Sequence, residues 1–338
     1  MVLLNSPKRV LVCGAGSIGR RHIVNLLKLG ADVSVWRARE DLLAELSQEF
    51  RVKTFARLTT AIAQAEAVVV ATATDEHVII AKEVLEARRA LFIEKPISNN
   101  WEGIDTLRYL ARDAVVEIGC QFRAHPNLKA LFSMLNMSKY GRPLTYRMVM
   151  GHRLDAWRAT QDYQQGYSAN SMRGGGALFD LIHQIDIALW HFGPIMAVNA
   201  VLGKIGDLNI QGDDIANLIL THKSGVTGQI QLDMLSPVHR CEAEIITSEA
   251  RITWSNTEGL LRCQLPESEI IADRIPEEFE RNDLFLTHMA HFLRRVDGMK
   301  LTPLCSFEEG VAALTVALSA RESNASGKMV KIQENNLW

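Results

Sequence analysis

An aspartate and a histidine three residues apart follow a run of three glycines, and this combination could transfer a proton. The run Gly174–Gly176 leads into Asp180 and His183, and apolar residues recur at helical spacing from Leu178 to Leu189. Side chains three positions apart share one face of a helix. A carboxylate beside an imidazole can orient the ring and raise its basicity. The pattern also fits a histidine that is hydrogen-bonded for structural reasons alone. Other parts of the chain are needed to decide between a catalytic and a structural histidine.

A second group with possible chemistry follows an apolar run, in the segment Phe92–Pro96. Lys95 comes directly after Glu94, at the expected end of a buried strand. A lysine there could hydrogen-bond a substrate hydroxyl, stabilise the oxyanion that forms before a hydride leaves, and take part in acid–base chemistry. Glu94 could orient Lys95 or bind the ribose of a nicotinamide. A surface ion pair at a strand end is the simpler alternative.

The glycine-rich turn near the start of the chain has the pattern of a dinucleotide-binding fingerprint. Gly14, Gly16 and Gly19 follow an apolar strand and open a helix, which is the context that the pattern requires. The first glycine permits the tight turn, the second lets a pyrophosphate approach, and the third lets helix and strand pack closely. The first helical turn, with Ser17 and Ile18, offers unpaired N–H groups to the phosphates. A glycine turn without a cofactor is the alternative.

The end of the second expected strand, Asp32–Trp36, bears on which dinucleotide binds. NAD-binding proteins place an acidic residue there for the ribose hydroxyl, whereas this chain has Arg37 and Arg39. Guanidinium groups could bind a 2′-phosphate, so the sequence favours NADP, with NAD possible. Both arginines could instead face solvent. After the fourth expected strand, the small residues Thr72 and Ala73 leave room for the nicotinamide ribose.

The order of expected elements predicts an α/β protein of two domains. Strands and helices alternate in the first part of the chain, which predicts a doubly wound parallel sheet of the Rossmann type. Later strands joined by short turns predict an α/β domain with a large open, mainly antiparallel sheet. We expect a dinucleotide-binding domain at residues 1–122 and a substrate-binding and oligomerisation domain at residues 123–338. An open sheet face is commonly covered by another subunit, so we expect a homodimer or homotetramer.

Composition narrows the class of protein. The 338 residues include 37 basic and 39 acidic side chains, without a basic stripe or a long uncharged apolar run. We therefore expect no nucleic-acid partner and no membrane span. The N-terminal segment lacks the apolar core of a signal peptide and the five cysteines are scattered, so we expect a cytoplasmic protein with reduced thiols. His288 and His291, with no acidic cluster near them in the sequence, read as surface or packing residues, and we expect no metal site.

Together these motifs resemble the Gfo/Idh/MocA oxidoreductases, the family of glucose–fructose oxidoreductase and inositol dehydrogenase. The resemblance rests on the glycine fingerprint, on Glu94-Lys95-Pro96 and on the segment Gly174–Asp186, and it covers essentially the whole chain. It implies hydride transfer between NAD or NADP and a carbon of a sugar, inositol or related polyol. It also implies that Lys95, Asp180 and His183 match the family's lysine, aspartate and histidine. Many members place that histidine four residues after the aspartate, whereas here the gap is three.

The chain also looks like a branch associated with bacterial surface-sugar gene clusters, which has the shorter spacing and carries Trp and Tyr residues before the glycines. The long polar segment 151–173 could contact a sugar, because arginines bind acidic groups and aromatic faces pack on sugar rings. An interdomain or subunit contact would use the same residue types. The candidate substrate-binding residues are Arg123, Arg153, Trp157, Arg158, Tyr163 and Arg173.

The sequence thus predicts an NAD(P)-dependent dehydrogenase acting on a CH–OH group of a sugar or sugar derivative. His183 would remove the hydroxyl proton, oriented by Asp180, and Lys95 would position the hydroxyl, although the lysine and histidine roles could be exchanged. Two alternatives stay open. One is an enzyme of the same fold that holds NAD(P) tightly and epimerises its substrate or cleaves a glycoside. The other is a non-catalytic NAD(P)-sensing protein.

Overall fold

The chain divides into two compact units, each of which is described by itself. The computed structural model describes residues 6–157, 162–266 and 271–333. The first unit consists of Met1–Ala124 with Glu280–Gly310, and the second consists of His125–Phe279 with Val311–Trp338. Residues 280–310, which we expected in the second domain, therefore group with the first unit.

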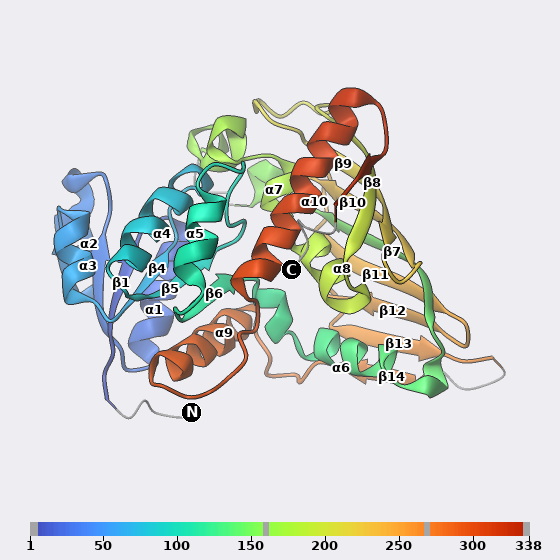
Figure 1. Ribbon diagram of the computed structural model, residues 1–338, viewed down its shortest axis with the longest axis horizontal. Helices are drawn as coiled ribbons and strands as arrows, with labels where there is room; N and C mark the ends of the chain where they lie inside the picture. The colour runs from blue at the N-terminus through green and yellow to red at the C-terminus, as the bar shows by residue number, and fades with distance from the viewer. Residues whose placement is uncertain (1–5, 158–161, 267–270, 334–338) are drawn as a thin grey trace. The chain divides into compact units, whose positions relative to one another are not determined.

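The first unit is built on a parallel sheet of six strands in the order β3-β2-β1-β4-β5-β6. Figure 1 labels β1, β4, β5 and β6 of this sheet. Val10–Cys13 and Ala67–Val70 are buried along their whole length, as expected for central parallel strands that helices cover on both faces. This order confirms the predicted doubly wound sheet. The strands are β1 (Arg9–Cys13), β2 (Asp32–Trp36), β3 (Lys53–Phe55), β4 (Ala67–Val70), β5 (Ala90–Glu94) and β6 (Val116–Gly119). The helices between them are α1 (Ser17–Lys28), α2 (Leu43–Phe50), α3 (Leu58–Gln64), α4 (His77–Glu86) and α5 (Ile104–Ala111).

A helix from late in the sequence completes this unit. Helix α9 (Arg281–Val296) packs against α1 (Figure 1). Its apolar side chains Met289, Phe292 and Leu293 are fully buried in the same hydrophobic core as the central strands. The polar side of α9 contacts β6, where Arg295 Nη1 lies 2.6 Å from a carboxylate oxygen of the buried Glu117. The core of the first unit is therefore filled by two segments that lie far apart in the sequence.

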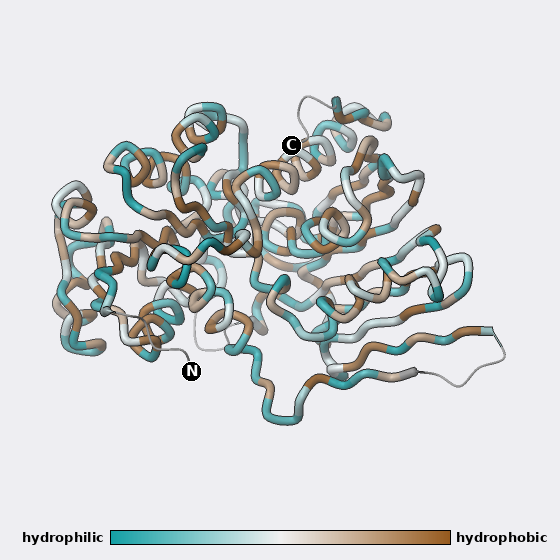
Figure 2. The backbone as a smooth tube through the Cα atoms, turned by 60° about the horizontal axis from the view of Figure 1, so that its bottom comes forward, coloured by the Kyte–Doolittle hydropathy of each residue, from teal (hydrophilic) through white to brown (hydrophobic). Residues whose placement is uncertain are grey.

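The second unit is built on a nine-stranded sheet in the order β14-β13-β12-β11-β7-β10-β9-β8-β15. All its neighbouring strands run antiparallel except β7 and β10, which confirms the predicted large, mainly antiparallel sheet. Hydrophobic and hydrophilic residues alternate along its strands (Figure 2), the pattern of a sheet with one buried and one open face. The strands are β7 (Pro143–Gly151), β8 (Ile195–Gly203), β9 (Ile215–His222), β10 (Thr227–Asp233), β11 (Arg240–Thr247), β12 (Arg251–Ser255), β13 (Leu260–Gln264), β14 (Ile271–Arg274) and β15 (Val330–Lys331).

The helices of the second unit include a break that the sequence did not predict. The apolar spacing predicted one helix from Leu178 to Leu189, but α7 (Ala177–Asp180) ends before α8 (His183–Phe192) begins, with Leu181 and Ile182 between them. The other helices are α6 (Pro126–Leu135) and α10 (Phe307–Ser326). Across the described ranges, no helix combines the length and the hydropathy that crossing a bilayer requires.

Candidate active site

The three glycines of the fingerprint have different surroundings, and each fits the role expected of it. A Cβ on Gly14 would lie 2.6 Å from the carbonyl oxygen of Ala71, and one on Gly19 would lie 2.1 Å from that of Gly14. These contacts require glycine for a tight turn and for close helix packing. A Cβ on Gly16 would meet nothing within 4 Å. Gly16 is also the N-cap of α1 without a side-chain cap bond, so the turn fits a diphosphate group.

The end of β4 adds a second feature that fits a nucleotide. The Oγ1 atom of Thr72 is buried and has no hydrogen-bond partner among the described residues. A buried hydroxyl without a partner is costly, and a bound ribose hydroxyl would satisfy it. Ala73 follows, and His77 Nε2 lies 3.3 Å from the carbonyl oxygen of Thr72. These residues fit the expected place of the nicotinamide ribose.

The end of β2 carries two positive side chains. Arg37 is half-buried, and in the described part of the chain it makes no ion pair, whereas the exposed Arg39 pairs with Asp41 at 2.9 Å. Burial and the neighbouring charge of Arg39 lower the pKa of Arg37. A phosphate dianion would relieve this repulsion.

Lys95 is half-buried directly after β5, and its neighbour Glu94 is only 5% exposed. The alternative of a solvated surface ion pair is therefore wrong, because the carboxylate lies inside the unit. Glu94 Oε2 accepts a hydrogen bond from the backbone N–H of Lys95 at 3.3 Å. Lys95 therefore stands at the end of β5 beside the buried carboxylate of Glu94.

Asp180, in the second unit, is a buried carboxylate that accepts hydrogen bonds from Ser168 and Gly176. The hydroxyl of Ser168 donates to Oδ1 at 3.2 Å, and the backbone N–H of Gly176 donates to Oδ2 at 3.3 Å. His183, the first residue of α8, is also buried. The two side chains are three residues apart as predicted, but they flank the break between α7 and α8 and do not share one continuous helix.

The triple glycine allows two chain segments to approach α7. A Cβ on Gly175 would lie 2.3 Å from the carbonyl oxygen of Tyr167, and Gly176 has a positive φ of 119°. Asp213 holds the start of α7 from another side, because its Oδ2 accepts from Leu178 N at 2.8 Å and its carbonyl accepts from Ala177 N at 2.8 Å. Burial raises the pKa of Asp213. Sequence reasoning missed Ser168 and Asp213 as supports of this segment.

Two of the predicted substrate-binding arginines are engaged within their own units. Arg123 is buried, forms an ion pair with Glu309, and donates to the carbonyl oxygen of Leu304 at 3.0 Å. Arg153 pairs with Asp155 at 3.0 Å and with Asp207 at 2.9 Å. The hydrogen bonds to Asp207 and Asp155 raise the pKa of Arg153. Their charges are therefore already balanced.

The other predicted substrate-binding residues lie along the irregular segment of the second unit. Trp157 Nε1 donates to the carbonyl oxygen of His152 at 2.8 Å. The Tyr163 hydroxyl accepts from the backbone N–H of Asn209 at 3.1 Å. Arg173 is half-buried in the turn that precedes the glycines. Arg158 lies outside the described residues.

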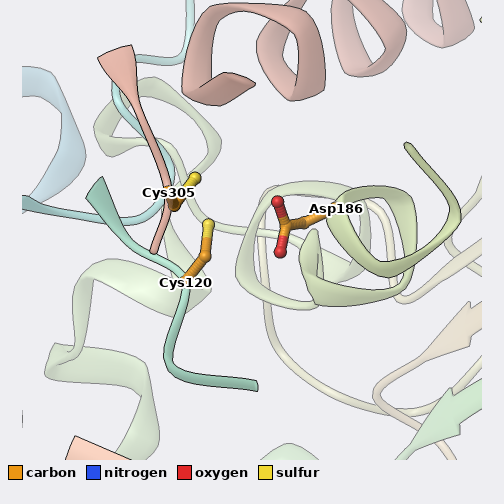
Figure 3. Close-up of side chains that lie close together, drawn as sticks. All are labelled: Cys120, Asp186 and Cys305. Carbon is orange, nitrogen blue, oxygen red and sulfur yellow. The ribbon is translucent and has the colours of Figure 1, made fainter. Parts of the chain in front are cut away.

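The five cysteines are buried and form no disulfide, as expected for reduced thiols. Cys120 and Cys305, both in the first unit, have sulfur atoms within 4.8 Å of each other (Figure 3). They lie where β6 ends, because the backbone N–H of Ile118 donates to the carbonyl oxygen of Cys305 at 2.9 Å. Two thiols fall short of the four-ligand set of a structural zinc site, so this pair carries no metal assignment.

Comparison with known proteins agrees with the fold and with the glycine turn. Residues 8–122 match a family described as oxidoreductases with an NAD-binding Rossmann fold, and residues 128–253 match the GFO/IDH/MocA C-terminal domain. The fold and the two matches define an NAD-binding oxidoreductase of two domains. The chain belongs to the Gfo/Idh/MocA family.

Several relatives have named activities. Over 346 residues the chain is 25% identical to a myo-inositol 2-dehydrogenase of Thermotoga maritima, covering 96% of this chain and 99% of the relative. It is 30% identical over 125 residues to a UDP-N-acetylglucosamine 3-dehydrogenase of Acidithiobacillus ferrooxidans, covering 36% and 40%. A solved levoglucosan dehydrogenase in complex with NADH and L-sorbose superimposes with a TM-score of 0.84 at 19% identity, covering 97% and 99%. This last likeness shows the fold.

Proposed function

We propose that this oxidoreductase transfers a hydride between a nicotinamide cofactor and a hydroxyl-bearing carbon of a sugar or cyclitol. The observation that carries the proposal is Asp180, a buried carboxylate held by Ser168 and Gly176 three residues before the buried His183. A non-catalytic nucleotide-binding protein has no need of such a group. The named relatives act on an inositol and on a nucleotide-linked sugar, which supports this class of substrate.

Each residue receives a role that its surroundings permit. The cofactor, when bound, supplies the hydride donor or acceptor. Lys95 donates a hydrogen bond to the substrate hydroxyl and stabilises the developing oxyanion. His183 accepts the hydroxyl proton, and Asp180 orients the chain segment that carries His183. In this assignment the first unit binds the dinucleotide, and the second unit binds the substrate.

For the cofactor we propose a preference for NADP over NAD. Arg37 stands where NAD-binding chains carry an acid, it has no ion-pair partner in the described ranges, and a second cation, Arg39, lies near it. The 2′-phosphate of NADP would bind mainly to Arg37, since Arg39 already pairs with Asp41. Gly16, Ser17 and Ile18 would contact the diphosphate, and Thr72, Ala73 and Glu94 would surround the nicotinamide ribose.

For the substrate we propose contacts from Trp157, Tyr163 and Arg173. Trp157 and Tyr163 have their polar atoms engaged, which leaves their ring faces as the groups that would pack on a sugar. The proposal extends to Arg158, which lies outside the described residues. Arg123 and Arg153 are weaker candidates, because each is already paired with a carboxylate.

We also propose that the chain forms a homodimer or homotetramer through the open face of the second sheet. Val201 on β8 is 64% exposed and Ile219 on β9 is 58% exposed. Their register partners, Asn217 and Asn199, are exposed on the same face. Large aliphatic side chains exposed side by side on such a face are typical of a covered interface. A cytoplasmic location is proposed because five buried cysteines that form no disulfide suit a reducing compartment.

The test begins with cofactor binding. Fluorescence titrations of the purified chain with NADPH and NADH should show binding, with NADPH tighter. Binding of neither nucleotide would overturn the proposal. Turnover is then followed at 340 nm with myo-inositol, levoglucosan and UDP-N-acetylglucosamine. Product without a net change in NAD(P)H would indicate epimerisation or glycoside cleavage instead.

The catalytic assignment is tested with Lys95→Met against Lys82→Met, an exposed lysine on α4. Lys95→Met should keep cofactor binding and remove most turnover, while Lys82→Met should behave as wild type. Wild-type activity of Lys95→Met would remove Lys95 from the mechanism.

A further inference from the structure

Lys95 lies between two residues that are each held by a buried histidine. On one side, Glu94 Oε1 lies 2.6 Å from Nε2 of His22, which projects from α1. On the other, the carbonyl oxygen of Pro96 lies 2.9 Å from Nδ1 of His77, the first residue of α4. The strand end that carries Lys95 is therefore anchored to two helices of the first unit.

His22 can act only as a donor to Glu94. The ring is 1% exposed and packs edge-on against Phe92 and Phe285, with centroid distances of 5.4 and 6.3 Å. Its second nitrogen, Nδ1, is buried without a hydrogen-bond partner among the described residues. A doubly protonated ring would leave a buried N–H unsatisfied. The neutral ring with its proton on Nε2 meets the carboxylate and leaves no unsatisfied donor.

Glu94 is held as an anion despite its burial. Burial raises its pKa, but the hydrogen bond from His22 and the positive charge of Lys95 outweigh this, so the pKa lies below its ordinary value. His77 is a further titratable group close to it. The space for the carboxylate exists because residue 119 is glycine, where a Cβ would lie 3.0 Å from all three carboxylate atoms.

We infer that His22 is a positioning residue for Lys95, acting through Glu94. The Nε2–H of His22 fixes the Glu94 carboxylate, whose other oxygen accepts from the backbone N–H of Lys95. His22 lies on α1, the helix that the glycine turn opens. Its bond to Glu94 therefore fixes the position of the proposed phosphate-binding helix relative to the strand end that carries Lys95. The inference rests on the catalytic role proposed for Lys95.

The alternative is a packing histidine, and the first unit contains a matched control for it. His288 on α9 is equally buried, packs edge-on against the same Phe92 ring at a centroid distance of 5.2 Å, and contacts the buried Glu117 at 3.2 Å. It has no hydrogen bond to Glu94 or Lys95 among those found in the described residues. Loss of either ring should lower stability, but only His22 should affect Lys95.

The first experiment needs no substrate. The protein is labelled with ¹⁵N-lysine, and the Lys95 amide resonance is identified by its absence in Lys95→Met. In wild type this resonance should not move between pH 8 and pH 5.5, because Glu94 stays ionised. In His22→Leu it should move over this range, because burial now raises the pKa of Glu94 without the opposing bond. His22→Gln, which keeps an N–H donor, and His288→Leu should resemble wild type.

The second experiment measures kcat against pH with whichever of myo-inositol, levoglucosan or UDP-N-acetylglucosamine is turned over. His22→Leu should bind NADPH within about threefold of wild type, lose about tenfold in kcat near neutral pH, and have its acid limb at higher pH. Glu94→Gln should be slow at every pH. A Lys95 resonance and a pH profile of His22→Leu that match those of His288→Leu would overturn the inference. Full activity of Lys95→Met would instead remove the catalytic role proposed for Lys95, whereas the proposed function is overturned if wild type binds neither NADPH nor NADH, so the failures are distinguishable.

Discussion

The hydroxyl of Ser168 donates a hydrogen bond to Oδ1 of Asp180 at 3.2 Å, across a turn that Gly175 keeps open. A carboxylate that receives one side-chain and one backbone donor is held in a single orientation. Ser168 therefore supports Asp180 from a segment twelve residues earlier in the chain.

Removal of this support should slow turnover without abolishing it. Ser168→Ala removes one neutral donor, worth about 0.5–1.5 kcal/mol, so kcat should fall about two- to tenfold. Asp180→Asn removes the charge and should reduce kcat about 10–100-fold or more. Steady-state kinetics with unchanged NADPH affinity would show that the effect lies on the substrate side. Ser171→Ala, in the following turn, serves as the control, and equal effects of both serine variants would contradict the role of Ser168.

Exchange of the charge at the end of β2 should change the cofactor preference. Arg37→Asp replaces the unpaired cation by the acid that binds a ribose hydroxyl, so NADPH affinity should fall about 10–100-fold and NADH affinity should rise. Fluorescence titrations with both nucleotides measure the ratio. Arg57→Asp, at an exposed arginine of the first unit, should leave the ratio unchanged. An unchanged ratio in Arg37→Asp would remove Arg37 from cofactor recognition.

The second sheet has no room for a side chain at Gly228. This residue pairs with Tyr146 in the parallel ladder of β10 and β7, and a Cβ there would lie 1.9 Å from Cζ of the Tyr146 ring. The ring cannot move freely, because it stacks on Phe192 at 4.5 Å and its hydroxyl bonds to His222 at 2.9 Å. Gly228→Ala should therefore destabilise the chain by about 1–3 kcal/mol or more.

Chemical denaturation measures this loss. Gly203→Ala at the end of β8, where a Cβ makes only an ordinary contact of 3.8 Å, is the matched control and should cost less than about 1 kcal/mol. The double variant Gly228→Ala with Tyr146→Ala should lose less stability than the sum of the two single variants, because the clash is then absent. Full additivity would show that the ring does not limit this position.

The buried carboxylate of Glu117 should make the free energy of unfolding depend on pH in the acid range. Burial raises its pKa, but hydrogen bonds from His288, His291 and Arg295 lower it to about 2. A carboxylate with a depressed pKa in the folded state contributes stability above its unfolded pKa, and this is lost as pH falls through the folded pKa. The window therefore runs from about pH 4.5 down to about pH 2, and the contribution is of order 3 kcal/mol.

Glu117→Gln removes this linkage. The difference in unfolding free energy between wild type and Glu117→Gln should be largest at pH 7 and should shrink at pH 3. Glu86→Gln, at an exposed residue of α4, should give a small difference at both pH values. A difference for Glu117→Gln that is the same at pH 7 and pH 3 would contradict the depressed pKa.

The parts of the fold that could be predicted from sequence are those whose signal is local. The parallel strands of the first unit are buried on both faces, so β1 and β4 appear as uninterrupted apolar runs, and the glycine turn has a fixed spacing. The alternation along β9 and β11 likewise reports a sheet with one open face. The break between α7 and α8 could not be predicted, because Leu181 and Ile182 continue the apolar spacing of a helix.

The hydrogen-bonded pairs that hold the candidate site in place are not revealed by any local sequence pattern. His22 and Glu94 are 72 residues apart, Leu178 and Asp213 are 35 apart, and His288 and Glu117 are 171 apart. The sequence shows that these residues can form hydrogen bonds, but the pairing depends on which strands and helices become neighbours. For this reason the sequence, which predicts surface or packing roles for His288 and His291, does not reveal Glu117, which the structure places beside both.

The return of residues 280–310 to the first unit has a consequence for synthesis on the ribosome. Met289, Phe292 and Leu293 fill the core under the parallel sheet, yet they are translated only after all the strands of the first unit and β7 to β14 of the second. While those strands are being translated, part of the apolar core of the nascent first unit stays exposed. An isolated fragment that stops near residue 124 would keep that exposed surface permanently and should aggregate, whereas supplying α9 as a separate peptide should rescue its solubility.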